Sequence, residues 1–350
     1  MDEFRHRPLP RQPHPCLLSR IARLGDSADR ACRVDGRGRM VIRTATLVLA
    51  LALAAPGAAS ERRLVFFSVG GGELDVGYDV AVRAICAEVN AAHAGRLRCS
   101  PETTPGSRYN VEALKSGDLG FGVAQWDLAK QAAADAPGGP LRLVARLFDE
   151  TFVLLTRPEA GIARLADLAG RRVDIGQPAS GRHVSARALF DATGVDTDAF
   201  STLLTLPASA AVDALCADRV DAVALVIGHP AAIVARALDA CDARVTPLSA
   251  AERRAVIAAQ PAFHEGFVPA GAYAALSRDA PTVALSAALL ARADQPSTVV
   301  GALTRTLVDR RAALGAATRL LADLDPAAMA DATDGPPLHP GARDAFAAAP

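Results

Sequence analysis

The sequence predicts an α/β protein of two domains. It has 350 residues, whereas a single hydrophobic core stops growing at about 250–300 residues. Strand-like runs alternate with helix-like runs, a pattern typical of parallel sheets covered by helices. Hydrophobic residues make up 51% of the chain and charged residues 22%, which favours a globular protein over a disordered one.

The first 60 residues are predicted to lie outside this fold. Residues 1–39 are rich in Arg and lack apolar periodicity, as expected of a non-native or disordered leader. Residues 40–60 resemble a secretory signal peptide, because the positive Arg43 precedes an apolar run at 45–55 and small residues follow. The run is shorter than the ~20 apolar residues of a bilayer span, although a buried core helix is an alternative. We therefore expect export to the periplasm and a mature chain that begins near Ser60 or Glu61.

The first lobe is predicted to comprise residues 61–150 and 282–350. An apolar run at 64–69 leads into the glycines Gly70, Gly71 and Gly72. A helix follows over 77–92, where apolar residues recur every three or four positions. This is the first strand–turn–helix unit.

A second unit repeats the plan. A strand over 97–103 ends in a turn, and Ser107 is a typical first cap of the helix that follows. A run of alternating apolar and small residues at 119–123 then delivers Gln125 to the end of a strand.

The second lobe is predicted to comprise residues 151–281. The chain enters it within a strand-rich stretch at 141–156 and returns along an apolar run at 282–293. A short strand, a loop at 176–181 and a helix ending at Gly194 form its first unit. The later elements predicted are a helix over 208–217, a strand over 220–227, a helix over 230–239 and a strand over 243–248.

Two strand-to-helix turns, Gly70–Gly72 and Ser180–Gly181, are candidate anion sites. Free N–H groups and the helix dipole favour negative charge at a helix N-terminus, and glycine allows a ligand to approach the backbone closely. The alternative is that these glycines serve turn geometry alone. The first turn lacks the downstream context of a dinucleotide-binding fingerprint.

Several function classes find no support in the sequence. Lys+Arg and Asp+Glu each number 38, so charge gives no reason to expect nucleic acid as a partner. The chain has no G-x-S-x-G elbow, no C-x-x-C and no H-x-x-x-H. We therefore expect no cofactor and no metal.

Four cysteines follow the signal-like segment: Cys86, Cys99, Cys216 and Cys241. An even number in an exported chain suggests two disulfides with three possible connectivities. Four free buried thiols are the alternative.

Four segments resemble the TAXI family, the extracytoplasmic solute-binding subunits of one class of TRAP transporter. They are the stretch from RAICAEVN to VAQWD at 83–127, RRVDIGQPASGRH at 171–183, the stretch from ALCADRVDAVAL to ALDACDA at 214–243, and PLHPGARDAF near the end. The resemblance covers the chain from about Leu64 to Phe346. It implies a periplasmic-binding-protein fold of the second type, in which two α/β lobes close over a ligand.

The resemblance also implies which residues bind and which cysteines pair. The ligand-binding residues it implies are Gly70, Gly71, Tyr78, Gly106, Ser107, Gln125, Ser180, Gly181, Arg182 and His183. The disulfides it implies are Cys86–Cys99 and Cys216–Cys241.

Within this set, Arg182 is expected to hold a ligand carboxylate through two hydrogen bonds, and His183 to be a pH-sensitive donor. Alternatively, Arg182 is a solvated residue of the first helical turn and only the backbone binds. The acidic residues Glu73, Asp75 and Asp79 depart from the family pattern and suit a ligand ammonium group.

The expected function is that of the solute-binding subunit of a TAXI-type TRAP transporter. It would capture a small organic acid or amino acid in the periplasm and deliver it to the membrane permease. One alternative is a periplasmic sensor that presents its ligand to a receptor kinase. Another is an enzyme on the same fold, for which His183 beside a carboxylate is the candidate pair.

Overall fold

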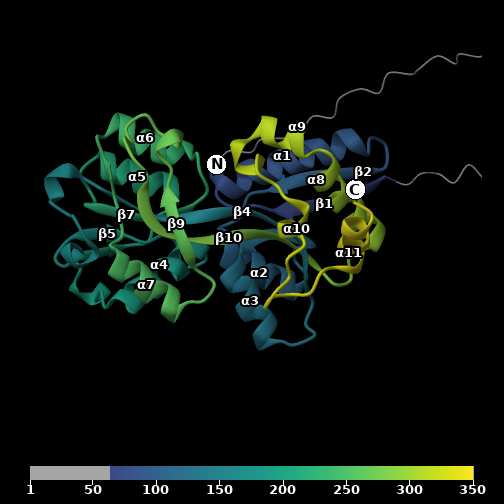
Figure 1. The fold of residues 1–350 in the computed structure, drawn as a ribbon, viewed down its shortest axis with the longest axis horizontal. Helices are drawn as coiled ribbons and strands as arrows, with labels where there is room; N and C mark the ends of the chain where they lie inside the picture. Colours follow the sequence, from purple (N-terminus) through teal and green to yellow (C-terminus); the bar gives the residue numbers. More distant parts are fainter. Residues whose placement is uncertain (1–63, 350) are drawn as a thin grey trace, which may run out of the picture. The chain divides into compact units, whose positions relative to one another are not determined.

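The computed structural model describes residues 64–349 of the chain (Figure 1). The predicted leader and signal peptide, residues 1–39 and 40–60, lie outside the described residues. Within residues 64–349, no helix has the length and apolar character needed to cross a membrane.

The strands of the described chain form one hydrogen-bonded sheet in the order β2-β1-β3-β10-β4-β7-β5-β6, with β8 on β4 and β9 on β10. They are β1 (Val65–Gly70), β2 (Leu97–Glu102), β3 (Phe121–Gln125), β4 (Leu141–Thr156), β5 (Arg172–Asp174), β6 (Thr202–Leu204), β7 (Ala222–Ile227), β8 (Arg244–Thr246), β9 (His264–Val268) and β10 (Ala280–Arg292). At one end β1 pairs in parallel with β2 and β3, and at the other β5 pairs in parallel with β6 and β7. The strands in between, β4 and β10, are antiparallel to their neighbours.

Helices cover both faces of this sheet. They are α1 (Gly77–Ala92), α2 (Ser107–Ser116), α3 (Trp126–Asp135), α4 (Gly181–Thr193), α5 (Ala208–Cys216), α6 (Ala232–Ala240), α7 (Ala250–Ala259), α8 (Ser297–Asp309), α9 (Arg311–Ala317), α10 (Pro326–Met329) and α11 (Pro340–Ala347). Short 3-10 helices are η1 (Pro158–Ala160), η2 (Leu165–Leu168), η3 (Thr197–Ala199), η4 (Ala270–Ala272) and η5 (Arg319–Leu321).

The long strands β4 and β10 belong to both ends of the sheet. β4 pairs with β10 along much of its length and then with β7 through Thr151–Thr156. β10 pairs with β9 through Ala280–Ala284 and with β3 through Ala287–Ala291. The sequence correctly predicted strands at both places. It predicted a separate sheet in each lobe, whereas these two strands join the parallel ends into one sheet.

Four hydrophobic clusters fill the described structure, two towards each end of the sheet, and each of them includes residues of β4 and β10. Two draw their buried residues from 69–147 and 287–342, with α1 and α8 in one and α2 and α3 in the other. The other two draw theirs from 152–285, with α4 and α7 in one and α5 and α6 in the other. Figure 1 shows these helix groups with β4 and β10 running between them. We call residues 64–150 and 286–349 the first half, and residues 151–285 the second half.

The predicted α/β fold class is confirmed, although some elements of the second half were not predicted. These include α7 and β9, which lie between the predicted strand over 243–248 and the return strand. A sequence signal for α7 exists, because Ser249 and Glu252 form a capping box at its start.

Candidate functional site

A small cavity lies where strand ends and turns of the two halves meet. It has a volume of about 60 Å³ and lies among the β1–α1, β2–α2 and β5–α4 turns, the end of β3 and the start of α5. Open α/β sheets commonly bind ligands beyond the carboxyl ends of their parallel strands. We call this space the strand-end cavity.

Seven of the ten predicted ligand-binding residues line the strand-end cavity. They are Tyr78, Gly106, Ser107, Gln125, Ser180, Gly181 and Arg182. Eight further lining residues were not among the predicted ligand-binding residues: Gly72, Glu73, Val76, Gly77, Pro105, Glu150, Ala208 and Val226. The sequence therefore located the turns and singled out Glu73 as an acidic residue of the first turn, but it missed Glu150 of β4.

On the side of the cavity formed by the first half, the lining residues are joined by a chain of buried hydrogen bonds. The Tyr78 hydroxyl donates to Glu150 Oε2 at 2.5 Å, and Ser107 Oγ donates to the Tyr78 hydroxyl at 3.3 Å. The backbone N–H of Gln125 donates to Ser107 Oγ at 3.1 Å. This network holds the phenol and the carboxyl group in fixed positions beside the cavity.

Burial controls the ionisation of this wall. Desolvation raises the pKa of Glu150 to about 8, and nearby Asp127 and Asp149 act in the same direction. The hydrogen bond from Tyr78 opposes that rise without cancelling it. Burial and the neighbouring Glu150 raise the pKa of Tyr78 well above its usual range, so the phenol keeps its proton.

Arg182 points into the second half and is already paired. Its Nη2 lies 3.1 Å from Asp174 Oδ1, and its guanidinium also donates to the backbone oxygens of Leu206 and Ala224. Only 7% of the residue is exposed, so the solvated alternative is wrong. Because its charge is paired with Asp174, the side chain ties α4 to β5 and β7. This pairing weighs against the Arg182 carboxylate clamp, which stays a prediction.

Three predicted residues lie outside the cavity lining: Gly70, Gly71 and His183. Asn110 Nδ2 donates to the Gly71 carbonyl at 2.6 Å, so this turn is bonded within its own half. A Cβ at Gly70 would lie 2.6 Å from Leu119 Cδ1, so that glycine serves packing. His183 Nδ1 donates to the Gly176 carbonyl at 2.8 Å, and its ring lines a separate, open hollow that Arg108 and Arg187 also line.

The two halves touch directly around the cavity. Glu73 of the β1–α1 turn accepts a hydrogen bond from the N–H of Ala208, the first residue of α5, at 2.5 Å. Ser185 Oγ donates to Gln125 Oε1 at 3.2 Å. A Cβ at Gly181 would overlap the Gln125 amide oxygen and would lie 2.6 Å from Ser107 Oγ, so only glycine allows this approach.

Comparison with known proteins places the chain in a family. The model of the NMT1-like family matches residues 71–347, which is most of the chain. The chain belongs to the NMT1-like family.

Solved structures similar to this NMT1-like chain are distant. One is XAC2383 from Xanthomonas citri bound to ATP, with 13% identity over 81% of this chain and 94% of that chain, at a TM-score of 0.45. Another is the alkanesulfonate-binding protein SsuA from Xanthomonas axonopodis pv. citri bound to MOPS, with 18% identity over 81% and 84% of the two chains, at a TM-score of 0.43. A third is a putative L-cystine ABC transporter protein from Listeria monocytogenes, with 12% identity over 74% and 96%, at a TM-score of 0.47. Matches this loose carry no ligand over to the NMT1-like chain.

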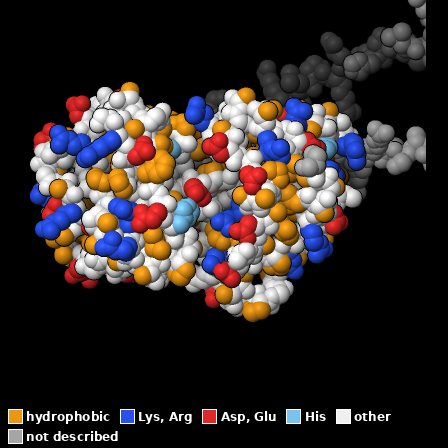
Figure 2. Space-filling view, viewed as in Figure 1, with side chains coloured by type: hydrophobic (Ala, Val, Ile, Leu, Met, Phe, Trp, Pro, Cys, Tyr) orange, Lys and Arg blue, Asp and Glu red, His pale blue; other side chains and the backbone are white. Residues whose placement is uncertain are grey.

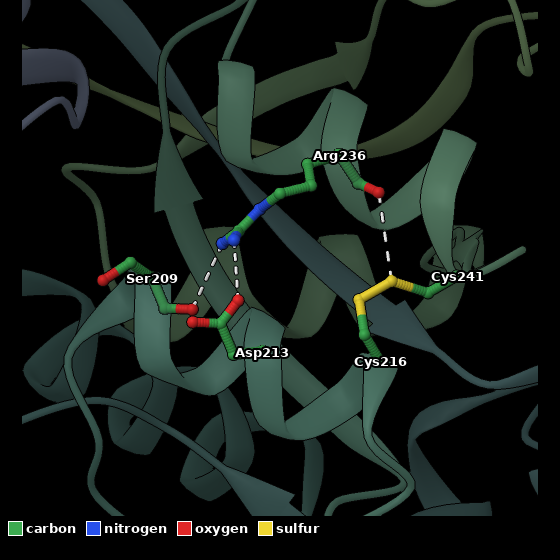
Figure 3. Close-up of a disulfide and its surroundings, with 5 residues drawn as sticks. All are labelled: Ser209, Asp213, Cys216, Arg236 and Cys241. Carbon is green, nitrogen blue, oxygen red and sulfur yellow. Dashed lines mark hydrogen bonds and ion pairs between the residues drawn. A yellow bond between two sulfur atoms is a disulfide. The ribbon is translucent and has the colours of Figure 1, made fainter.

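Both disulfides implied by the resemblance are present in the NMT1-like chain. Cys86 of α1 is bonded to Cys99 of β2, and Cys216 of α5 to Cys241 after α6, each with Cα atoms 5.0 Å apart. Figure 3 shows the second disulfide beside the Arg236–Asp213 ion pair, which also links α6 to α5. The helix whose first N–H meets Glu73 is therefore fixed at both of its ends.

A larger hollow of about 440 Å³ lies beside β4 and β10. Arg146, Asp149 and His229 line it together with the segment 319–331. Consecutive residues of a strand point to opposite faces, so Asp149 faces this hollow whereas Glu150 faces the strand-end cavity.

On the face seen in Figure 2, acidic, basic and histidine side chains gather over β9 and β10.

Proposed function

We propose that this chain is an extracytoplasmic solute-binding protein that holds a small molecule between its two halves and delivers it to a membrane permease. The observation that supports this most is the strand-end cavity itself, which turns from both halves enclose and buried polar groups line. In this account the two halves are lobes, divided near residues 150 and 282, and β4 and β10 form the hinge between them.

The buried hydroxyl groups of the cavity suit binding better than catalysis. A serine nucleophile needs an adjacent general base. Here Ser107 Oγ is bonded to the Tyr78 hydroxyl and to the Gln125 backbone, and Ser180 Oγ donates to the Gln177 carbonyl. These hydroxyl groups hold the turns in position.

The finer assignment follows from the sequence resemblance. We propose that the partner is the permease of a TAXI-type TRAP transporter and that the protein works in the periplasm. Two disulfides in the described chain fit an oxidising compartment. Of the ligand classes that the resemblance implies, organic acids and amino acids, the acidic groups of the cavity favour the amino acids.

A thermal-shift screen of the purified exported protein tests this function. The panel holds amino acids, organic acids and amines, each added at increasing concentration. A true ligand at 100 times its Kd adds about 2.7 kcal/mol to the free energy of unfolding. The Tyr78→Phe variant should lose part of that gain, because it removes the hydroxyl that Ser107 and Glu150 share.

Tyr109 is exposed, so the Tyr109→Phe variant is the matched control. A ligand should stabilise it as much as it stabilises the parent protein. A panel in which no compound of any class stabilises the parent protein would contradict the proposed function.

A further inference from the structure

We propose that the strand-end cavity recognises a ligand ammonium group through Glu73 and Glu150, so that its ligands are small amines or zwitterions and not simple carboxylates. This inference rests on the proposed function and adds the sign of the charge that the site selects.

The first step is the charge of the lining. Three of the cavity-lining side chains end in a carboxyl or guanidinium group: Glu73, Glu150 and Arg182. Arg182 is paired with the buried Asp174 at 3.1 Å, so its charge is balanced before any ligand arrives. The ionisable groups that remain without an opposite charge are the carboxyl groups of Glu73 and Glu150. An anionic ligand would therefore meet two carboxyl groups and no unpaired cation among the lining residues.

The second step is the hydrogen-bonding state of the two carboxyl groups. Among the described residues, Glu150 has one hydrogen-bond partner, the Tyr78 hydroxyl, and only 4% of the residue is exposed. Among residues 64–349, the carboxyl group of Glu73 also has one hydrogen-bond partner, the Ala208 N–H. In its ionised form a carboxyl group has two oxygens and about four acceptor positions, so both groups, once ionised, have capacity for an ammonium donor, which brings three N–H bonds.

The third step is size. The cavity of about 60 Å³ has room for a group of a few non-hydrogen atoms. Val76, Pro105, Ala208 and Val226 add apolar surface to the same lining. Such a space suits an ammonium group on a short alkyl chain better than a large polar headgroup.

A bound cation would also couple binding to pH. Burial raises the pKa of Glu150 to about 8, so this group is mainly protonated at neutral pH. Tyr78 of α1, Asp127 of α3 and Asp149 of β4 are the charged or titratable groups that act on it. A ligand ammonium favours the ionised form, so amine binding releases a proton and strengthens as the pH rises toward 8. An anionic ligand would show the opposite trend.

The test is isothermal titration calorimetry with three probes that share a four-carbon chain: butylamine, 4-aminobutyrate and butyrate. We expect the two amines to bind and butyrate not to bind. Between pH 6 and pH 8 the affinity for butylamine should rise roughly fivefold or more. The amine itself stays charged over this range, because an alkylammonium has a pKa of about 10.

Three variants sharpen the test. Glu73→Gln and Glu150→Gln should each weaken amine binding roughly tenfold or more, and Glu150→Gln should also remove the pH dependence. Glu102→Gln, an exposed residue just before the β2–α2 turn, should bind like the parent.

Tighter binding of butyrate than of butylamine, or an affinity for amines that falls as the pH rises, would overturn the ammonium site. So would the failure of every amine in a wider panel. Neither result would overturn solute binding as such, which fails only when compounds of every class fail to bind. The probe comparison needs no variant, so misfolding of a mutant cannot obscure it.

Discussion

The turn Gly70–Gly72 and the turn Ser180–Gly181 both join a strand to a helix, and they meet the other half in different ways. Gly70 and Gly71 face their own half, where Leu119 and Asn110 pack against them. Gly181 faces the opposite half and touches its buried polar groups. Glycine at such a turn indicates close packing, and only the surroundings show whether the neighbour is the same half, the other half or a ligand.

The charged side chains of the two turns differ as well. The second turn carries Arg182, which bonds inward to Asp174. The first turn carries Glu73, which reaches across to α5. The acidic group therefore comes from the turn in which Gly72 lines the cavity and Gly70 and Gly71 do not. The charged side chains of the turns therefore indicate which ligand charge the site can bind, whereas the positions of the glycines do not.

The largest effect should come from breaking the inward ion pair of the second turn. Arg182→Met leaves Asp174 buried without its cation, so we expect a loss of about 3–5 kcal/mol in the free energy of unfolding. Chemical denaturation measures this loss. Arg187→Met, on the exposed side of the same helix, is the control and should change stability by no more than about 0.5 kcal/mol. A stable Arg182→Met protein with a tenfold loss of ligand affinity would restore the clamp predicted from the sequence.

The next test separates the two turns by their glycines. Gly70→Ala should cost about 1–3 kcal/mol of stability, because its Cβ meets Leu119 and Asn110 within one half, and ligand affinity should stay unchanged. Gly181→Ala should also cost stability, because its Cβ meets the buried Gln125 and Ser107, but in contrast to Gly70→Ala it should lower ligand affinity about tenfold or more.

Gly271→Ala is the control for both glycine variants, because nothing lies within 4 Å of its Cβ position. Equal effects of Gly70→Ala and Gly181→Ala on ligand affinity would remove the distinction between the turns. Calorimetry with a ligand from the screen, together with denaturation curves, gives both readouts.

The smallest effect should come from His183. Its ring bonds to the Gly176 carbonyl outside the strand-end cavity, so His183→Ala should cost about 1 kcal/mol of stability and change affinity less than about twofold. A tenfold loss of affinity would place the imidazole back at the ligand.

Much of the fold was predictable because its signals are local. The periodic apolar residues of 77–92 and the long apolar runs at 141–156 and 282–293 became α1, β4 and β10. That β4 and β10 join the two ends into one sheet was not predictable, because the sequence pattern of a long strand does not indicate which strands pair with it along each part of its length.

The cavity was predictable in part, for a similar reason. Turns at strand ends were visible in the sequence, and seven predicted residues reached the lining. The direction of Arg182 was not, because neighbouring helical residues point about 100° apart and their partners come from distant strands. Glu150 is one of four charged residues in the stretch 141–156, so its charge alone did not mark it as a cavity residue.

The central claim is that a ligand binds in the strand-end cavity and not in the hollow beside β4 and β10. Hydrogen exchange measured by mass spectrometry, with and without a ligand from the screen, tests it directly. We expect slower exchange in peptides covering 72–78, 105–109 and 178–185, and no change over 319–331. Slower exchange confined to 319–331 would place the ligand in the hollow beside β4 and β10 and contradict the account.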